Sequence, residues 1–126
     1  MRYGNPKSET INFLDMSEEE IMAIATPIMD NLMDASTHID HERHVRDCTE
    51  RFKSVCSKEH LERVCQKYQS EKGFFTERQL IAVLKRPDSA AILWKQYFTK
   101  AEGEYVAEMA LVHQDGKYLC DHVMVF

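Results

Sequence analysis

The stretch Val112-His113-Gln114-Asp115-Gly116-Lys117-Tyr118, near the end of the 126-residue chain, decides the fold. It places an Asp-Gly pair between two runs in which apolar and polar residues alternate. Asp-Gly is a strong signal for a two-residue type I′ turn, because both central residues of that turn need a positive φ. The stretch therefore predicts an antiparallel hairpin with these opposed pairs: Gln114 and Lys117, His113 and Tyr118, and Ala110 and Asp121.

Working outward from this hairpin, the two-residue period extends back to Phe74. It predicts four consecutive antiparallel strands at 75–85, 90–100, 104–114 and 117–126. The face that carries Trp94 and Met109 is the more apolar one, so we expect it to pack against helices. Its in-phase neighbours are Gln96 on the second strand and His122 on the fourth.

The residues before Gly73 have a helical period instead. Ser17 and Glu20 form a capping box, which predicts a helix that begins at Glu18. Pro27, after Thr26, indicates either a kink in that helix or the start of a second one. Asp40 is typical of an N-cap and predicts a helix that runs toward Val55. Ser57 predicts the start of a further helix, and Gly73 predicts its C-terminus. Helices followed by strands predict an α+β fold.

Composition indicates one folded domain, with 44% hydrophobic and 29% charged residues. We expect a loose N-terminal leader at 1–13 and a single α+β domain at 14–126. The net charge of −5 gives no general attraction for nucleic acid. The sequence shows neither a signal peptide nor an apolar run of membrane-spanning length, so with Met1 as the natural start we expect a cytoplasmic protein without a membrane partner. The alternative is that Met1 replaces a removed signal peptide. Its four cysteines are expected to be buried and reduced: Cys48, Cys56, Cys65 and Cys120.

Segments 21–40, 80–84, 92–95 and 115–118 together resemble small uncharacterised prokaryotic members of the nuclear transport factor two-like (NTF2-like) superfamily, whose domains are cystatin-like cones. The resemblance implies N-terminal helices packed in the concave face of a strongly bent four-stranded antiparallel sheet. It also implies a pocket at the open end of the cone. The superfamily includes isomerase-like and dehydratase-like enzymes as well as many non-catalytic proteins, and related cones often pair through the sheet.

Four residues are candidates for the wall of this pocket: Trp94, Gln96, Met109 and His122. Pockets combine apolar walls with a few convergent polar groups, and Gln96 and His122 are polar residues among apolar neighbours of the same phase. Both residues would equally fit hydrogen bonds to backbone within the core or a place near a sheet edge. Of the four, only His122 titrates near neutral pH.

His41, His44 and Cys48 fall at helical positions i, i+3 and i+7, with His38 nearby, and these residue types bind transition metals. Their neighbours are mostly charged and the spacing matches no familiar zinc module, so we expect neither a functional metal nor a cofactor. His113 and Asp121 would face opposite sides of the sheet in the predicted register, which disfavours an acid–base dyad. No catalytic motif is present, and we assign no catalytic residue.

These observations favour a non-catalytic module that binds a small hydrophobic molecule or supports assembly, with a pocket between helices and sheet. The alternative is a lyase or isomerase that acts on such a molecule, with His122 as general base. We also expect a homodimer through the outer sheet face, where contiguous apolar surface is typical of an interface. That face is predicted to carry Leu93, Tyr97, Val106, Ala110, Val112 and Val123, interrupted by Lys95, Glu108 and Asp121.

Overall fold

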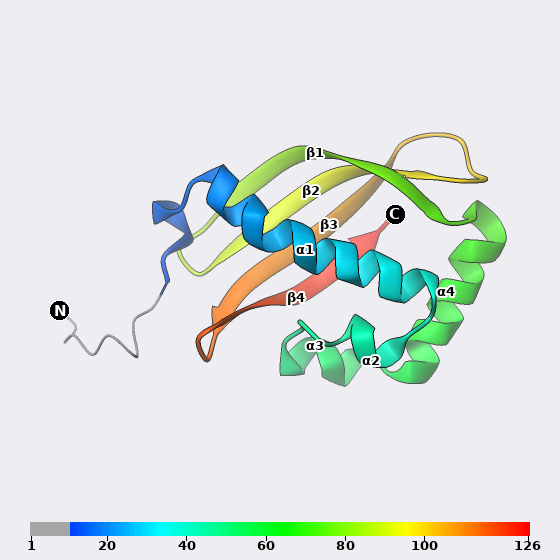
Figure 1. Cartoon of the computed structure of the whole chain (residues 1–126), viewed down its shortest axis with the longest axis horizontal. Helices are drawn as coiled ribbons and strands as arrows, with labels where there is room; N and C mark the ends of the chain where they lie inside the picture. Colours follow the sequence, from blue (N-terminus) through cyan, green and yellow to red (C-terminus); the bar gives the residue numbers. More distant parts are fainter. Residues whose placement is uncertain (1–10) are drawn as a thin grey trace.

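The computed structural model describes residues 11–126 and places helices before strands, as the sequence predicts (Figure 1). The helices are α1 (Glu18–Thr37), α2 (His41–His44), α3 (Glu50–Val55) and α4 (Lys58–Lys72), after a 3-10 helix at Phe13–Asp15. The strands are β1 (Phe75–Lys85), β2 (Ser89–Phe98), β3 (Tyr105–Gln114) and β4 (Lys117–Val125). They form one antiparallel sheet in the order β1-β2-β3-β4.

Helix α1 lies across one face of the sheet, α4 stands at one end, and α2 and α3 lie beside β4 (Figure 1). The α+β class is therefore confirmed. The resemblance also led us to expect a strongly bent sheet, and the structure does not show the sheet as strongly curled. The helices cover one face of the sheet, and the other face has no cover among the described residues.

The start of α1 is the predicted capping box: Ser17 accepts from the Glu20 amide, and the Glu20 carboxylate accepts from the Ser17 amide. Pro27 lies inside α1 and does not end it. Proline leaves the carbonyl four residues earlier without its helical donor. Pro27 and Ala23 both lie on the exposed side of α1, so water can reach that carbonyl. Of the two alternatives left open by the sequence, a second helix that begins at Pro27 is therefore wrong, because α1 is one continuous helix.

The helix predicted to run from Asp40 toward Val55 is interrupted. Asp40 caps α2 as expected, but the chain leaves the helical conformation after His44 and resumes it at α3. Between the two helices, Cys48 forms a parallel β-bridge with Cys120 of β4. The Thr49 amide donates to the Cys120 carbonyl at 3.0 Å. The segment before α3 thus covers the edge of β4, where unpaired backbone groups would otherwise face solvent.

The hairpin that decides the fold forms as predicted. Asp115 and Gly116 have φ values of 52° and 77°, which fits a type I′ turn, and Gln114 lies opposite Lys117. The register changes further along β4, because a β-bulge at Asp121 inserts one extra residue. Ala110 consequently lies opposite His122, and the predicted pairing of Ala110 with Asp121 is wrong.

This bulge exchanges the two faces of the second half of β4, because side chains alternate with a period of two. Val123 lies opposite the buried Met109 and packs against the core, so its predicted place on the outer face is wrong. His122 lies on the outer face opposite Ala110, not in phase with Trp94. The outer face therefore gains His122 and Met124 and loses Val123 and Asp121.

The core lies between α1 and the sheet. Trp94 is 4% exposed and belongs to this cluster together with Met29 of α1 and Met109 of β3, which confirms that its face of the sheet meets the helices. Phe13 is fully buried in the same cluster, and its amide donates to the Pro87 carbonyl. The folded part thus begins before residue 14, the start expected for the domain. Residues 1–10 of the expected leader lie outside the described residues.

Candidate ligand-binding cavity

A cavity of about 470 Å³ lies between the helices and the β4 side of the sheet. All four helices contribute to its wall, and the ends of β1, β2 and β3 close it together with β4. Most of the lining side chains are apolar, including Met33, Phe52, Leu61, Val64, Phe75 and Phe98. Binding sites for small molecules typically have this size and an apolar wall of this kind.

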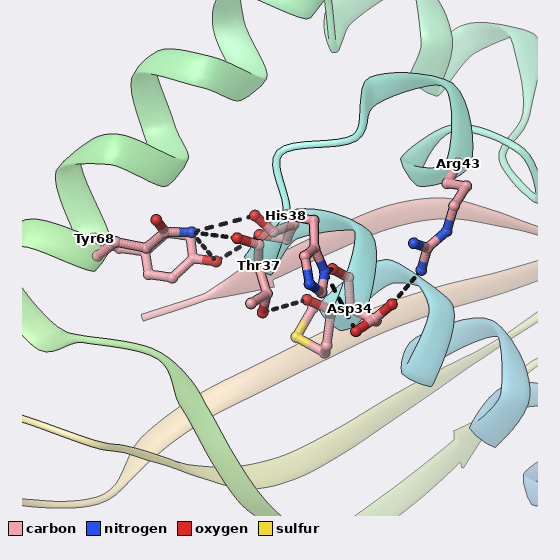
Figure 2. Close-up of polar contacts among 8 residues, drawn as sticks. Asp34, Thr37, His38, Arg43 and Tyr68 are labelled. Atoms are coloured by element: carbon pink, nitrogen blue, oxygen red, sulfur yellow. Dashed lines mark hydrogen bonds and ion pairs between the residues drawn. The ribbon is translucent and has the colours of Figure 1, made fainter.

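One group of polar side chains in the wall joins α1 to α4. The Ser36 hydroxyl lies 2.7 Å from the Tyr68 hydroxyl and 3.2 Å from the Cys65 thiol. The Gln69 amide donates to the carbonyls of Ser36 and Thr37 at the end of α1; Figure 2 shows Tyr68 beside Thr37 at this contact. Burial raises the pKa of Cys65 and of Tyr68, so both are protonated at neutral pH.

His44 and Cys56 form a second polar pair in the wall. His44 is 6% exposed, and its Nδ1 lies 3.9 Å from the Cys56 Sγ. Burial, with a smaller contribution from the charge of His41, lowers the pKa of His44 to about 4. Burial raises the pKa of Cys56 to about 11. At neutral pH the pair is therefore a neutral imidazole beside a neutral thiol, whereas a reactive cysteine needs a thiolate.

The bulge residue Asp121 borders the cavity beside α3. Arg51 Nε donates to Asp121 Oδ1 at 3.0 Å, and the Thr49 hydroxyl donates to the same oxygen at 2.7 Å. Burial alone would raise the pKa of Asp121, but the hydrogen bonds from Arg51 and Thr49 outweigh it and lower the pKa. Asp121 is therefore an ionised carboxylate, bound through Oδ1, that holds α3 to β4.

The four residues predicted for the pocket lie in different places. Trp94, Gln96 and Met109 are buried in the core and do not line the cavity. Gln96 Nε2 donates to backbone carbonyls of Thr76 and Glu77, at an irregularity of β1. Its Oε1 is the one buried side-chain oxygen or nitrogen among residues 11–126 that has no partner. The Gln96 side-chain amide thus donates hydrogen bonds to backbone carbonyls at a break in the β1–β2 pairing.

His122 does line the cavity, but its imidazole points elsewhere. His122 Nε2 lies 2.7 Å from Glu108 Oε2 on the outer face of the sheet. His113 packs its ring edge-on against Tyr118, whereas Asp121 pairs with Arg51 of α3. The structure therefore does not bring His113 and Asp121 together.

The histidines before α3 are held by separate partners. His41 Nε2 donates to the Cys56 carbonyl at 2.7 Å, and the Cys48 thiol donates to the His44 carbonyl. His38 lies beside Asp34, which also pairs with Arg43 (Figure 2). Within residues 11–126, no group of three or more His, Cys, Asp or Glu side chains is arranged to hold a metal ion.

Sequence reasoning missed most of the polar side chains that do line the cavity, among them Ser36, His44, Cys56, Tyr68 and Lys72. Part of the signal was present, because Ser36 follows Leu32 by one helical turn on the buried side of α1 and Tyr68 shares the stripe of Leu61 and Cys65 on α4. His44 gave no such signal, since it lies in a stretch of charged residues. Its burial depends on how α2 packs against α3.

Helices that precede a four-stranded antiparallel sheet, with a cavity between them, define this protein as an α+β domain, and its fold is similar to that of a solved NTF2-like protein. An NTF2-like protein of unknown function from Methylobacillus flagellatus KT superposes with a TM-score of 0.58 over 90% of this chain and 96% of that chain, at 11% sequence identity. Bd1075 from Bdellovibrio bacteriovorus gives a TM-score of 0.51 at 13% identity over 87% of this chain and 42% of that chain. The chain thus spans less than half of Bd1075.

No family model and no curated protein sequence matches the chain. The similarity to both solved structures is therefore a similarity of fold. None of the described helices has the length and apolar character needed to cross a bilayer.

Proposed function

We propose that this protein binds a small apolar molecule in the cavity between α1, α3, α4 and β4, without transforming it. The observation that carries the proposal is the cavity itself, which measures about 470 Å³ and has a mainly apolar wall. Water in such a space makes few hydrogen bonds, so its replacement by an apolar ligand is favourable. The few polar groups in the wall would orient the ligand.

The polar groups of the wall support binding more than catalysis. Ser36 is bonded to Tyr68, Asp121 to Arg51, and His44 lies beside a protonated Cys56. A lyase or isomerase that uses His122 as general base has less support, because Glu108 holds that imidazole on the outer face of the sheet. Proton transfer requires the base to reach the substrate directly or through one water molecule.

Val64→Trp tests the proposal, because Val64 lines the cavity, is 45% exposed and can accept a larger side chain without disturbing the core. The wild-type protein should bind the neutral fluorescent probe N-phenyl-1-naphthylamine saturably, with one site per chain. The indole of the variant should occupy part of the cavity and weaken binding by about tenfold or more, which corresponds to about 1.4 kcal/mol. Fluorescence titration measures both affinities.

Leu84→Trp is the matched control, since Leu84 is 54% exposed on the outer face of β1, away from the cavity. It should leave the affinity for the probe unchanged. Equal affinities of wild type and Val64→Trp, or only weak unsaturable binding to the wild type, would contradict the proposal.

We propose in addition that two copies associate through the outer face of the sheet. Apolar side chains on three strands share this face, including Leu93, Val106, Val112 and Met124. The charged side chains among them have partners within the chain, since Lys95 pairs with Glu104 and the Glu108 carboxylate lies 2.7 Å from the His122 imidazole. A second copy is the occupant that fits best, because a two-fold axis places this same largely apolar surface, with its internally partnered charges, against itself.

Val106→Asp should convert the dimer into a monomer. Val106 is 37% exposed on β3, opposite Lys95, which is already paired with Glu104, so the substitution would bury an additional carboxylate in the interface. Sedimentation equilibrium at micromolar concentration should give about twice the 14.8 kDa chain mass for the wild type and one chain mass for the variant. Leu14→Asp, at an exposed position outside the sheet, should remain dimeric. A monomeric wild type would refute the dimer.

A further inference from the structure

Lys72 is a cation at the aromatic end of the cavity. It is the last residue of α4 and lines the cavity, with its Nζ 6.0 Å from the ring centre of Phe98 and 5.7 Å from that of Tyr105. None of the ion pairs formed among residues 11–126 includes Lys72. Its ammonium group is therefore available to a ligand in the cavity.

The backbone of Lys72 is fixed at the end of α4. The Lys72 carbonyl accepts hydrogen bonds from the amides of Lys100 and Ala101, at 2.9 and 3.2 Å. The next residue, Gly73, has a φ of 86°, and a Cβ atom there would lie 2.1 Å from the Thr99 Oγ1. The end of α4 is thus packed closely against the loop after β2. A cation at a helix C-terminus is also stabilised by the helix dipole.

The charged side chains in the wall of the cavity have a net charge opposite in sign to that of the whole chain. Among the lining side chains, Arg51, Lys72 and Asp121 are the ones that are formally charged when histidines are counted as neutral. Arg51 and Asp121 neutralise each other through their ion pair. One positive charge, that of Lys72, remains in the wall, although the chain as a whole carries −5. Low-dielectric walls strengthen the field of such a charge inside a cleft.

We propose that the ligand of the cavity is an amphipathic carboxylic acid, with its carboxylate bound by Lys72 and its apolar body beside Met33, Leu61 and Val64. This inference rests on the proposed function, because it names the class of molecule that the cavity takes. A charge-assisted hydrogen bond from an ammonium to a carboxylate is about twice as strong as a neutral one, so the site would discriminate acids from neutral analogues. The competing role for Lys72 is purely structural, as a cation over two aromatic rings.

Comparison of decanoate with decanol separates these roles, because both share an apolar chain and only one carries a charge. At pH 7.5, each compound is titrated against the protein loaded with N-phenyl-1-naphthylamine, and displacement of the probe gives its affinity. The wild type should bind decanoate about tenfold or more tightly than decanol. Lys72→Met should weaken decanoate binding by about tenfold and leave decanol binding unchanged. Lys72→Arg should retain most of the preference for decanoate.

Lys67→Met is the matched control, since Lys67 is an exposed lysine of the same helix that does not line the cavity. It should behave as the wild type. If the probe binds and decanoate is bound no better than decanol, or if Lys72→Met keeps the preference, the inference is wrong and the proposed function stands. If neither the probe nor the two ligands bind to the folded wild type, the proposed function fails and the inference fails with it.

Discussion

Replacement of Trp94 by alanine should lower the free energy of unfolding by about 3–5 kcal/mol, the range expected when a buried aromatic side chain is truncated. Trp94 is 4% exposed at the centre of the sheet face that meets α1. The guanidinium of Arg78 lies 5.1 Å from its ring and pairs with Asp30 of α1 at 2.5 Å. The truncation therefore leaves a void and removes the surface on which this sheet-to-helix ion pair rests.

Urea unfolding followed by circular dichroism measures this loss, which is a large part of the about 5–15 kcal/mol typical of a whole domain. Leu84→Ala is the control, because Leu84 lies on the outer face of the same sheet and is 54% exposed. It should cost less than about 1 kcal/mol. Similar costs for both substitutions would contradict the placement of Trp94 against the helices.

Lowering the pH from 7.5 to 4.5 should destabilise the protein by about 2–3 kcal/mol through His44 alone. Burial lowers the pKa of His44 to about 4 in the folded chain, whereas an exposed histidine has a pKa of about 6.5. Between these values the unfolded chain binds the proton and the folded chain does not. Stability from this group is thus complete above about pH 6.5 and is lost as the pH falls toward 4.

The pH dependence of the urea midpoint measures this effect, and His44→Gln should remove most of it between pH 7.5 and 4.5. The same substitution at His60, an exposed residue of α4, should leave the difference in place. A His44→Gln variant with an unchanged pH dependence would show that His44 is solvated in the folded protein.

Signals contained in short segments allowed much of the fold to be predicted. Asp115 and Gly116 can both adopt a positive φ, so the turn and the first pairs of the hairpin followed from two adjacent residues. The caps at Ser17, Asp40 and Ser57 could be recognised in the same way, because a capping side chain bonds an amide only two or three residues away. Such local interactions need no partner from a distant part of the chain.

The candidate site was less accessible to prediction, because it depends on one residue of register. Strict alternation predicts that His122 lies on the same face of the sheet as Trp94, whereas the bulge at Asp121 places it on the outer face. Asp121 occupies the bulge with its carboxylate bound by Thr49 and Arg51, residues about 70 positions earlier in the chain. The local sequence of β4 gives no indication that Asp121 contacts Thr49 and Arg51.

By itself, the sequence determined the α+β class, the hairpin at Asp115 and the burial of Trp94, since periodicity and turn chemistry act over a few residues. Only the tertiary structure decided which polar residues line the cavity. His44 lies in a charged stretch and becomes buried because α2 packs against α3, and Lys72 reaches Phe98 and Tyr105 because α4 ends against the sheet. The physical reason is that a cavity forms where separate elements meet, and its wall is set by their packing.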